Sequence, residues 1–345
     1  MSVQPEASHR TAMRVHPELV PAYEALPRFS DPYEDIEATR DGFRAILAAF
    51  PADRTGVRSE RFGIRRADGS TLTVEVYRPE EAAGAGPDAT GGAGDAGAAL
   101  PAVLHFHGGG FALGRSLPGQ DRVAIELCRE LPAVVITVEY RLAPEHRYPA
   151  GVEDCYRALE WVAERAAELG VDPARIAVAG KSAGGGLSAA VALMARDRGG
   201  PALVHQSLCV PDLDDRVGAD EAEDGEGALD ARVLTGRGVR ASWRHYLPEG
   251  AAEAEAYAAP SRATDLSGLP PAHVLVCDLD PMRDAGLAYA RRLMDAGVPV
   301  TVRNVPGAWH GFELFAPDTR VAKEMTAHWT GQLREALHPA SPAVV

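Results

Sequence analysis

The feature that most restricts the fold of this 345-residue chain is an alternation of short apolar runs with segments of helical periodicity. The apolar runs have the length and composition of buried strands: Ala102–Phe106, Ala133–Tyr140, Arg175–Ala179, Leu203–Val210, His273–Cys277 and Val300–Val305. Thr71–Tyr77 alternates with period two, as a half-buried strand does. Helical periodicity is found at Ala150–Leu169, Ser182–Arg196, Asp284–Ala296 and Val321–Leu337. The alternation predicts an α/β protein whose mostly parallel central sheet has helices on both faces.

Two regions, residues 1–50 and 212–250, do not follow this alternation and are candidates for a helical cap over one end of the sheet. We therefore expect an N-terminal cap segment over residues 1–55 and a main domain over 56–345, with a cap insertion at about 212–250. Residues 81–99 are nearly all Ala, Gly and Asp and predict a flexible loop. The acidic run 212–230 is interpreted as a solvated surface insertion, with a binding lid as the alternative.

Composition excludes several classes of partner. The net charge of −14 would repel a polyanion, so we expect no nucleic-acid partner. The chain has no run of 18 apolar residues, so we expect no membrane-spanning helix. Its first 20 residues lack the apolar core of a secretory signal. Four widely spaced cysteines form no C-x-x-C pair, which favours reduced thiols over disulfides or a zinc site. A cytoplasmic protein is expected.

A Gly-x-Ser-x-Gly pentapeptide, Gly180–Gly184, lies between the predicted strand Arg175–Ala179 and the next helix. In a strand-to-helix turn this tight the serine backbone is strained, and glycines two residues on either side avoid clashes. Such a turn holds the Ser182 hydroxyl over a helix N-terminus, whose dipole favours developing negative charge. The pentapeptide alone is a weak signal, but in this context it predicts a nucleophilic serine.

A second motif, His107–Gly110, directly follows the predicted strand Ala102–Phe106. Glycines there allow main-chain N–H groups to approach a substrate oxygen with no Cβ in the way. Together with the N–H group of Ala183, such donors would form an oxyanion hole. His107 itself is expected to shape this loop by hydrogen bonding, without acting as a catalytic base.

A serine nucleophile requires a base, and the base requires an orienting carboxylate. Asp278, Asp280 and Asp284 follow one late strand and compete for the acid role; Asp280 is placed best, and Asp284 could cap the following helix. His310 is the histidine that follows a late strand in a loop with glycine on either side. Both loops leave the carboxyl ends of strands, where ligands bind in open α/β sheets. The chain order Ser, Asp, His matches that of α/β-hydrolases.

Together these motifs resemble the hormone-sensitive-lipase family of α/β-hydrolases, which contains many microbial carboxylesterases. The resembling segments run from about residue 60 to the C-terminus and comprise His107–Gly110, Tyr140–Glu145, Val178–Gly185, Leu269–Pro271, Asp280–Asp284 and His310–Phe312. The resemblance implies the α/β-hydrolase fold with a cap built from the N-terminal segment and an insertion.

The resemblance also implies roles for individual residues. Ser182 would be the nucleophile, His310 the general base and Asp280 its partner. The oxyanion donors would be the N–H groups of Gly109, Gly110 and Ala183.

The chain departs from the family pattern at two positions. Lys181 precedes the serine where the family usually has Asp, and Glu139 precedes the Tyr140–Glu145 motif where Asp is usual. Lys181 is either a neutral substitution with its side chain partly in solvent, or a cation that lowers the pKa of His310.

Other residues of the motif regions have structural and functional interpretations. Phe111 is a candidate for the acyl pocket, and Trp309, next to His310, is assigned either to packing or to substrate contact. Arg141 and Glu145 are predicted to form a structural ion pair or hydrogen-bond network under the oxyanion loop.

The function predicted from these observations is hydrolysis of carboxylic esters with short acyl chains through an acyl-enzyme, without metal or organic cofactor. Amide hydrolysis, deacetylation or acyl transfer in a biosynthetic pathway would use the same triad and remains an alternative. A ligand-binding protein on a hydrolase scaffold is a further alternative, which the joint presence of Ser182, Asp280 and His310 disfavours. The expected partner is a small ester; a homodimer is left open.

Overall fold

A computed structural model of the chain describes residues 15–27, 32–48, 52–80, 99–114, 121–218, 232–248 and 254–339. Eight strands of this part form one sheet in the order β1-β2-β4-β3-β5-β6-β7-β8. They are β1 (Val57–Arg65), β2 (Thr71–Pro79), β3 (Leu100–Phe106), β4 (Val134–Glu139), β5 (Val171–Lys181), β6 (His205–Cys209), β7 (Ala272–Cys277) and β8 (Val300–Val305). β3 to β8 pair in parallel, whereas β1 and β2 pair antiparallel at one edge. The expected mostly parallel sheet is confirmed.

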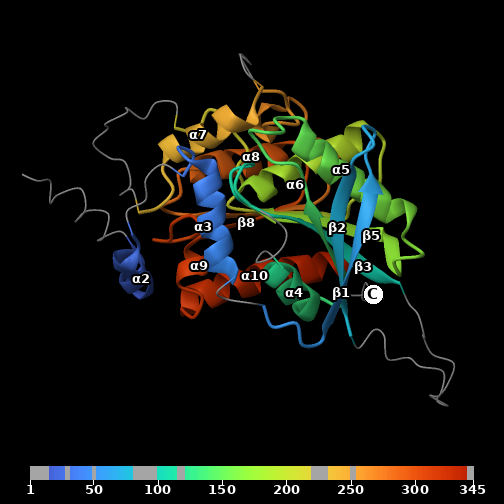
Figure 1. Cartoon of the computed structure of the whole chain (residues 1–345), viewed down its shortest axis with the longest axis horizontal. Helices are drawn as coiled ribbons and strands as arrows, with labels where there is room; N and C mark the ends of the chain where they lie inside the picture. The colour runs from blue at the N-terminus through green and yellow to red at the C-terminus, as the bar shows by residue number, and fades with distance from the viewer. Residues whose placement is uncertain are drawn as a thin grey trace, which may run out of the picture.

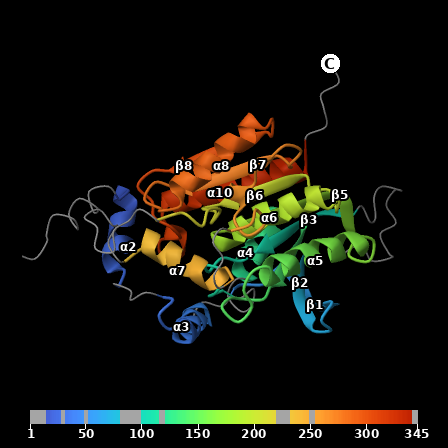
Figure 2. The same cartoon turned by 90° about the horizontal axis from the view of Figure 1, so that it is seen from above.

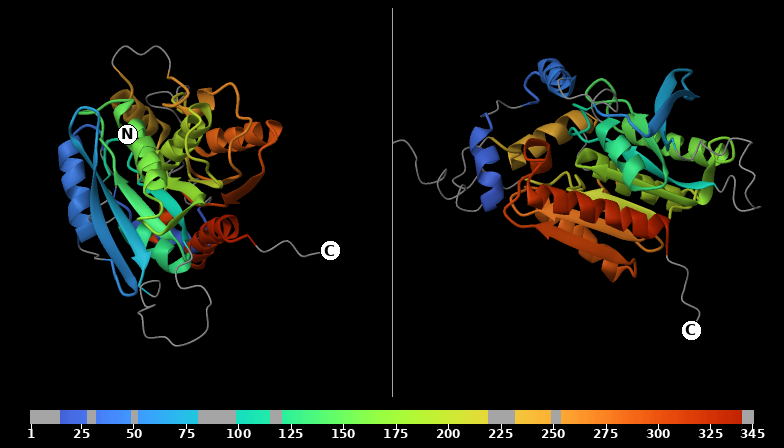
Figure 3. Two further views of the ribbon diagram at one scale, coloured as in Figure 1. Left: turned by 90° about the vertical axis from the view of Figure 1, so that its right-hand side faces the viewer. Right: turned by 90° about the horizontal axis from the view of Figure 1, so that it is seen from below.

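Helices cover both faces of this sheet. They are η1 (Pro17–Leu19), α2 (Val20–Ala25), α3 (Ile36–Ala48), α4 (Asp121–Glu130), α5 (Ala150–Glu164), α6 (Ala183–Asp197), α7 (Gly236–Tyr246), η3 (Pro260–Arg262), α8 (Arg283–Asp295), α9 (Phe312–Phe315) and α10 (Arg320–Leu337). α5, α6 and α8 lie on one face, and α4 and α10 lie on the other (Figures 2 and 3).

Burial on both faces explains why β3 and β4, in the middle of the sheet, are mostly apolar. Along β3, Leu104 packs into the cluster under α5 and α6, and Val103 packs into the cluster under α4 and α10. The same alternation holds along β5, where Val178 and Ala177 point to opposite faces. Because both side-chain directions meet helices, the few polar side chains of these strands, such as His105 and Thr137, are buried as well.

Several helices lie outside the two helical layers. α2, α3 and α7 gather at one end of the molecule, next to α9 (Figures 1 and 2). α2 and α3 come from the expected N-terminal cap segment, and α7 comes from the expected insertion between β6 and β7. The division at residue 55 stays a prediction. The expected loop 81–99 lies outside the described residues up to position 98, as do residues 219–231 of the insertion.

Some elements differ from those expected. Helix α5 ends at Glu164 and not at the expected Leu169. From Arg165 the chain continues in turns. Ala166 and Leu169 are nevertheless buried, so their apolar spacing continues the helical pattern beyond the helix. Gly170, with φ +59°, closes these turns. β1 and α4 were not predicted.

Within the described residues, no helix combines the length and apolar character needed to cross a membrane. The four cysteines, Cys128, Cys155, Cys209 and Cys277, are all buried and unpaired, as expected for free thiols.

Candidate active site

Ser182 forms the turn between β5, which ends at Lys181, and α6, which begins at Ala183. Its backbone has φ +58° and ψ −125°, a strained conformation for a residue with a side chain. The flanking glycines are required by space: a Cβ on Gly180 would overlap the backbone of Gly184, and one on Gly184 would overlap the carbonyl of Phe106. The turn therefore has the geometry that the pentapeptide predicted, with the hydroxyl at the end of the sheet.

His310 and Asp280 meet at this serine. His310 Nε2 lies 3.0 Å from Ser182 Oγ, and His310 Nδ1 lies 2.6 Å from Asp280 Oδ2. The other oxygen of Asp280 accepts a hydrogen bond from the N–H of Met282, and its side chain is almost completely buried. The structure thus brings together the three residues expected from the sequence.

The two competing carboxylates are placed elsewhere. Asp284 is 80% exposed and forms an ion pair with Arg283 in the first turn of α8. Asp278 also contacts Arg283, and accepts a hydrogen bond from the N–H of Gly307. Neither forms a hydrogen bond with His310.

The electrostatic surroundings suit His310 as a base. Burial acts to lower the pKa of His310, but the charge and hydrogen bond of Asp280 outweigh it and raise the pKa above its ordinary value. The Glu313 carboxylate acts in the same direction. An imidazolium formed by proton transfer from Ser182 would therefore be stabilised where it appears.

The glycine loop lies directly against the serine turn. A Cβ on Gly108 would be 2.9 Å from the Lys181 carbonyl oxygen and 3.3 Å from Ser182 Cβ. Gly109 and Gly110 have φ +117° and +54°, so the loop depends on glycine. Among the described residues, no group accepts a hydrogen bond from the N–H of Gly109, Gly110 or Ala183. These three donors are available to an oxyanion beside Ser182.

His107 holds this loop in place. Its Nδ1 lies 2.8 Å from the Gly108 carbonyl oxygen, and its ring stacks on Tyr140 at 4.2 Å between centroids. The Tyr140 hydroxyl donates to the His107 carbonyl at 2.9 Å. Each contact is to the loop or to its support, which fits the expected structural role.

The two expected substrate-binding aromatics are both buried. Trp309 is 1% exposed and packs against Tyr23 and Phe312, which favours the packing interpretation; its contact with substrate stays a prediction. Phe111, in the turn after the glycines, stacks on Tyr246 of α7 at 3.9 Å. It builds the wall between the oxyanion loop and the cap, and its place in an acyl pocket stays a prediction.

Arg141 and Glu145 do not form an ion pair with each other, but each belongs to a hydrogen-bond network, which was the other expected arrangement. Arg141 binds the buried Asp154 at 2.9 Å, and Glu145 binds Arg40 at 2.7 Å. Arg40 comes from α3 and also donates to the carbonyl oxygens of Ala112 and Ala143. No local pattern indicates this contact between cap and oxyanion loop, because its partners are 72 to 105 residues apart in the chain.

Lys181 has a partner as well. Its Nζ lies 3.0 Å from Glu313 Oε1 and 4.9 Å from the centre of the Trp329 ring. The side chain is about four-fifths buried, so it does not extend into solvent. Because Glu313 follows His310 by three residues, the pair joins the serine strand to the histidine loop.

Asp212 was missed by the sequence interpretation, which assigned it to a solvated acidic run. It is 2% exposed, its N–H donates to the Ser182 carbonyl at 3.0 Å, and its Oδ1 accepts from Trp243 Nε1 at 3.0 Å. Its position directly after a buried parallel strand was the available signal, since ligands bind at such strand ends.

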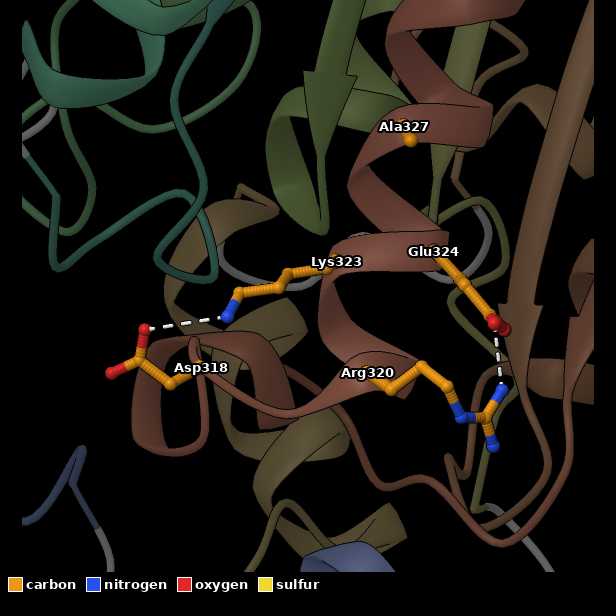
Figure 4. A pocket seen from close by; sticks show the side chains of 5 residues that line it. All are labelled: Asp318, Arg320, Lys323, Glu324 and Ala327. Carbon is orange, nitrogen blue, oxygen red and sulfur yellow. Dashed lines mark hydrogen bonds and ion pairs between the residues drawn. The ribbon is translucent and has the colours of Figure 1, made fainter.

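A separate surface hollow lies beside the start of α10, lined by Asp318, Arg320, Lys323, Glu324 and Ala327 (Figure 4). Its side chains form exposed ion pairs, Lys323 with Asp318 at 3.7 Å and Arg320 with Glu324 at 2.6 Å. It includes none of the residues around Ser182. In the part of the chain that the structure describes, no group of three or more His, Cys, Asp or Glu side chains could hold a metal ion.

Comparison with known proteins agrees with this geometry. The family model described as alpha/beta hydrolase fold matches residues 103–314. The chain is an α/β-hydrolase. This α/β-hydrolase is 44% identical over 243 residues to a carboxylesterase, NlhH, of Mycobacterium tuberculosis, covering 69% of this chain and 75% of that protein.

Two solved structures are similar over nearly the whole α/β-hydrolase. A bacterial heroin esterase has a TM-score of 0.83 and 37% identity, covering 95% of this chain and 99% of its own. A thermostable esterase from Pseudomonas putida ECU1011 has a TM-score of 0.81 and 32% identity, covering 98% and 100%. The expected family, the fold and the enzyme class, a serine hydrolase of the carboxylesterase type, are confirmed.

Proposed function

We propose that this α/β-hydrolase cleaves carboxylic esters with short acyl chains through an acyl-enzyme formed on Ser182. Ser182 Oγ attacks the ester carbonyl while His310 Nε2 accepts its proton. The negative charge on the carbonyl oxygen is stabilised by the N–H groups of Gly109, Gly110 and Ala183. Asp280 holds the imidazole in the required tautomer and stabilises the imidazolium.

The second half of the reaction repeats these steps with water. His310 first donates its proton to the leaving alcohol, which departs and leaves the acyl group on Ser182. A water molecule then attacks the acyl carbonyl as His310 accepts its proton, and the carboxylic acid is released. No step requires a metal ion or an organic cofactor.

The observation that carries this proposal is the continuous chain of contacts from Asp280 through His310 to Ser182, at 2.6 and 3.0 Å. A scaffold kept only for ligand binding would not need this alignment. The named relatives are esterases, so amide hydrolysis, deacetylation and acyl transfer are less favoured.

The test is turnover of p-nitrophenyl esters and labelling by an organophosphate in the wild type and in Ser182→Ala. We expect the variant to keep its fold, because both side chains are small, and to lose turnover and labelling. Ser188→Ala is the matched control: Ser188 lies on α6, the helix that follows Ser182, and its hydroxyl donates to the Gly184 carbonyl. Turnover retained within about tenfold in Ser182→Ala, or labelling of another serine, contradicts the proposal.

We further propose that the protein works in the cytoplasm, which the four buried unpaired thiols support.

A homodimer through the β8 edge is also proposed. β8 ends the sheet and has β7 as its one neighbour there, and Val302 on it is 39% exposed. The mass in solution, measured by light scattering, tests it; a monomer at micromolar concentration contradicts it.

A further inference from the structure

Asp212 is buried beside Ser182, and no basic side chain of the described residues forms an ion pair with it. Four other carboxylates of the described residues are equally buried, and each has a basic partner: Glu75 with Arg61, Asp121 with Arg54, Asp154 with Arg66, and Asp280 with His310. The one hydrogen bond that a described group donates to the Asp212 carboxyl comes from Trp243 Nε1. Because a buried carboxylate is costly unless it is paired, this arrangement leaves a place for a positive charge.

The backbone fixes Asp212 beside the nucleophile. Val210, at the end of β6, has φ +41°, which is rare for a β-branched residue. The chain then turns so that the Asp212 N–H donates to the Ser182 carbonyl at 3.0 Å. The first turn of α6 follows closely, since a Cβ on Gly186 would overlap the Asp212 carbonyl.

The other side of Asp212 faces the cap. Trp243, which binds its Oδ1, lies on α7 and contacts Phe111 with 5.2 Å between ring centroids. Tyr246, one turn later, stacks on the same ring. Asp212 therefore lies between the serine turn and an aromatic wall formed by the cap and the oxyanion loop.

Burial and four neighbouring groups determine the pKa of Asp212. Burial raises its pKa to about 7; the Trp243 hydrogen bond and the His310 charge act to lower it, and Asp280 and Asp214 act to raise it. Tyr246, which faces it from α7, stays neutral because burial raises its own pKa well above the ordinary value. A carboxyl with this pKa is ionised in the upper part of the physiological pH range.

We propose that the Asp212 carboxylate binds a positively charged group, such as a quaternary or protonated amine, on the ester that Ser182 attacks. This inference rests on the proposed function. The cation supplies the partner that the other buried carboxylates have within the chain. Trp243, whose Nε1 donates to Asp212 Oδ1, places an aromatic ring beside the same carboxyl, and such a ring attracts a cation. Asp212 is then a specificity-determining residue, not a member of the triad.

The test compares pairs of esters that differ only in charge. On the alcohol side, 2-(trimethylammonio)ethyl acetate is compared with 3,3-dimethylbutyl acetate. On the acyl side, the p-nitrophenyl ester of 4-(trimethylammonio)butanoate is compared with that of 5,5-dimethylhexanoate. At pH 8.5 we expect the kcat/KM ratio of cationic to neutral ester, for at least one pair, to fall about tenfold in Asp212→Asn. Asn keeps the acceptor for Trp243.

The pH dependence of the same kcat/KM ratio tests whether the ionised form of Asp212 is the one that binds. His310 titrates equally for both esters of a pair, so its effect cancels, and the ratio is expected to rise with pH through about 7 as Asp212 ionises. Asp214→Asn is the matched control at pH 8.5, because Asp214 lies two residues away, pairs with Arg216 and acts on Asp212 only by raising its pKa. At that pH Asp212 is ionised in both proteins, and the ratio should match the wild type. Ratios that Asp212→Asn leaves unchanged for both pairs overturn the inference while leaving ester hydrolysis intact.

Binding without turnover separates this inference from the proposed function. In the Ser182→Ala background, tetramethylammonium at pH 8.5 is expected to raise the Tm, and the added Asp212→Asn substitution is expected to abolish that rise. An equal rise in both proteins, or none in either, overturns the inference. Loss of ester turnover and of labelling in the wild type would instead overturn the proposed function.

Discussion

At the residue scale, three aspartates within seven positions have different surroundings and therefore different consequences when changed. Asp280→Asn keeps the size of the side chain but cannot hold His310 in the tautomer that accepts the serine proton. We expect kcat to fall by about four orders of magnitude. Asp284→Asn is an exposed change on α8 that loses an ion pair with Arg283, and we expect its kcat to stay within about twofold of the wild-type value.

Steady-state kinetics of both variants on one p-nitrophenyl ester, with their Tm values as a check on folding, distinguish the two carboxylates. If Asp284→Asn is the damaging substitution, the contact between His310 and Asp280 is not the one used in catalysis.

The second prediction at this scale concerns the ion pair between Lys181 and Glu313. Glu313 contributes to raising the pKa of His310, and catalysis requires the neutral imidazole. Glu313→Gln removes that negative charge and leaves the Lys181 ammonium nearby, so the pKa of His310 falls. The acid limb of kcat/KM should move to lower pH by a fraction of a unit to about one unit.

Lys181→Gln is the opposite change and serves as its control. It leaves the Glu313 charge uncompensated, so the acid limb should move to higher pH. pH–rate profiles of both variants at two ionic strengths give the measurement. Shifts in the same direction, or no shift in either, would mean that this pair does not act on His310.

At the scale of elements, α3 is connected to the site through Arg40. Its guanidinium donates to the Ala112 and Ala143 carbonyls, both at 2.8 Å, and pairs with Glu145. Arg40→Ala removes this contact under the oxyanion loop, while the sheet and its two helical layers are untouched. We expect kcat/KM to fall by roughly tenfold to a hundredfold through misplaced oxyanion donors, with a smaller effect on Tm.

The matched control is Arg44→Ala. Arg44 lies one turn later on α3, and its partner among the described residues is Asp41, an exposed neighbour on the same helix. Near wild-type kinetics in Arg44→Ala and a loss in Arg40→Ala would show that the contact, and not the charge of α3, matters. Equal losses would contradict this.

Elements differ in how far the sequence predicted them. The central strands and α6, α8 and α10 were predicted within a few residues, because burial on two faces or on one stripe imposes a regular apolar pattern. β1 (VRSERFGIR) was missed because it ends the sheet and pairs with β2 alone, so most of its side chains stay partly exposed and polar. Long-range contacts such as Arg40 with Ala112 depend on the folded arrangement of the cap and leave no local pattern.

The residues of the candidate active site were, like the helices and strands, predicted only in part. The order of Ser182, Asp280 and His310 at strand ends brought the three together correctly, because parallel strands end at one edge of the sheet. Asp212 and Lys181 were misjudged for the same reason: the sequence shows a charged residue but not the helices that bury it. For Trp309 the sequence left packing and substrate contact open, because closeness to His310 in the chain does not determine the direction of its side chain.

At the scale of the whole molecule, charge and surface composition predict the physical state of the substrate. The exposed large apolar side chains among the described residues are Leu287, Met294, Val302, Leu314 and Phe315, and of these Leu314 and Phe315 on α9 lie near His310 in the chain. Two side chains are a small apolar surface for adsorption to a lipid interface. The net charge of −14 opposes adsorption to an anionic one.

We therefore expect the enzyme to act on dissolved esters, with kcat/KM highest for acyl chains of roughly two to eight carbons and falling for longer chains. Aromatic packing of Phe111, Trp243 and Tyr246 between the oxyanion loop and α7 limits the space for a long chain. Initial rates on tributyrin, measured from below to above its solubility limit, provide the check. The rate should saturate with the dissolved ester and show no rise when droplets form. A jump at the solubility limit, or a higher kcat/KM for p-nitrophenyl palmitate than for the butyrate, would show that the cap opens to a lipid surface and that the short-chain assignment is wrong.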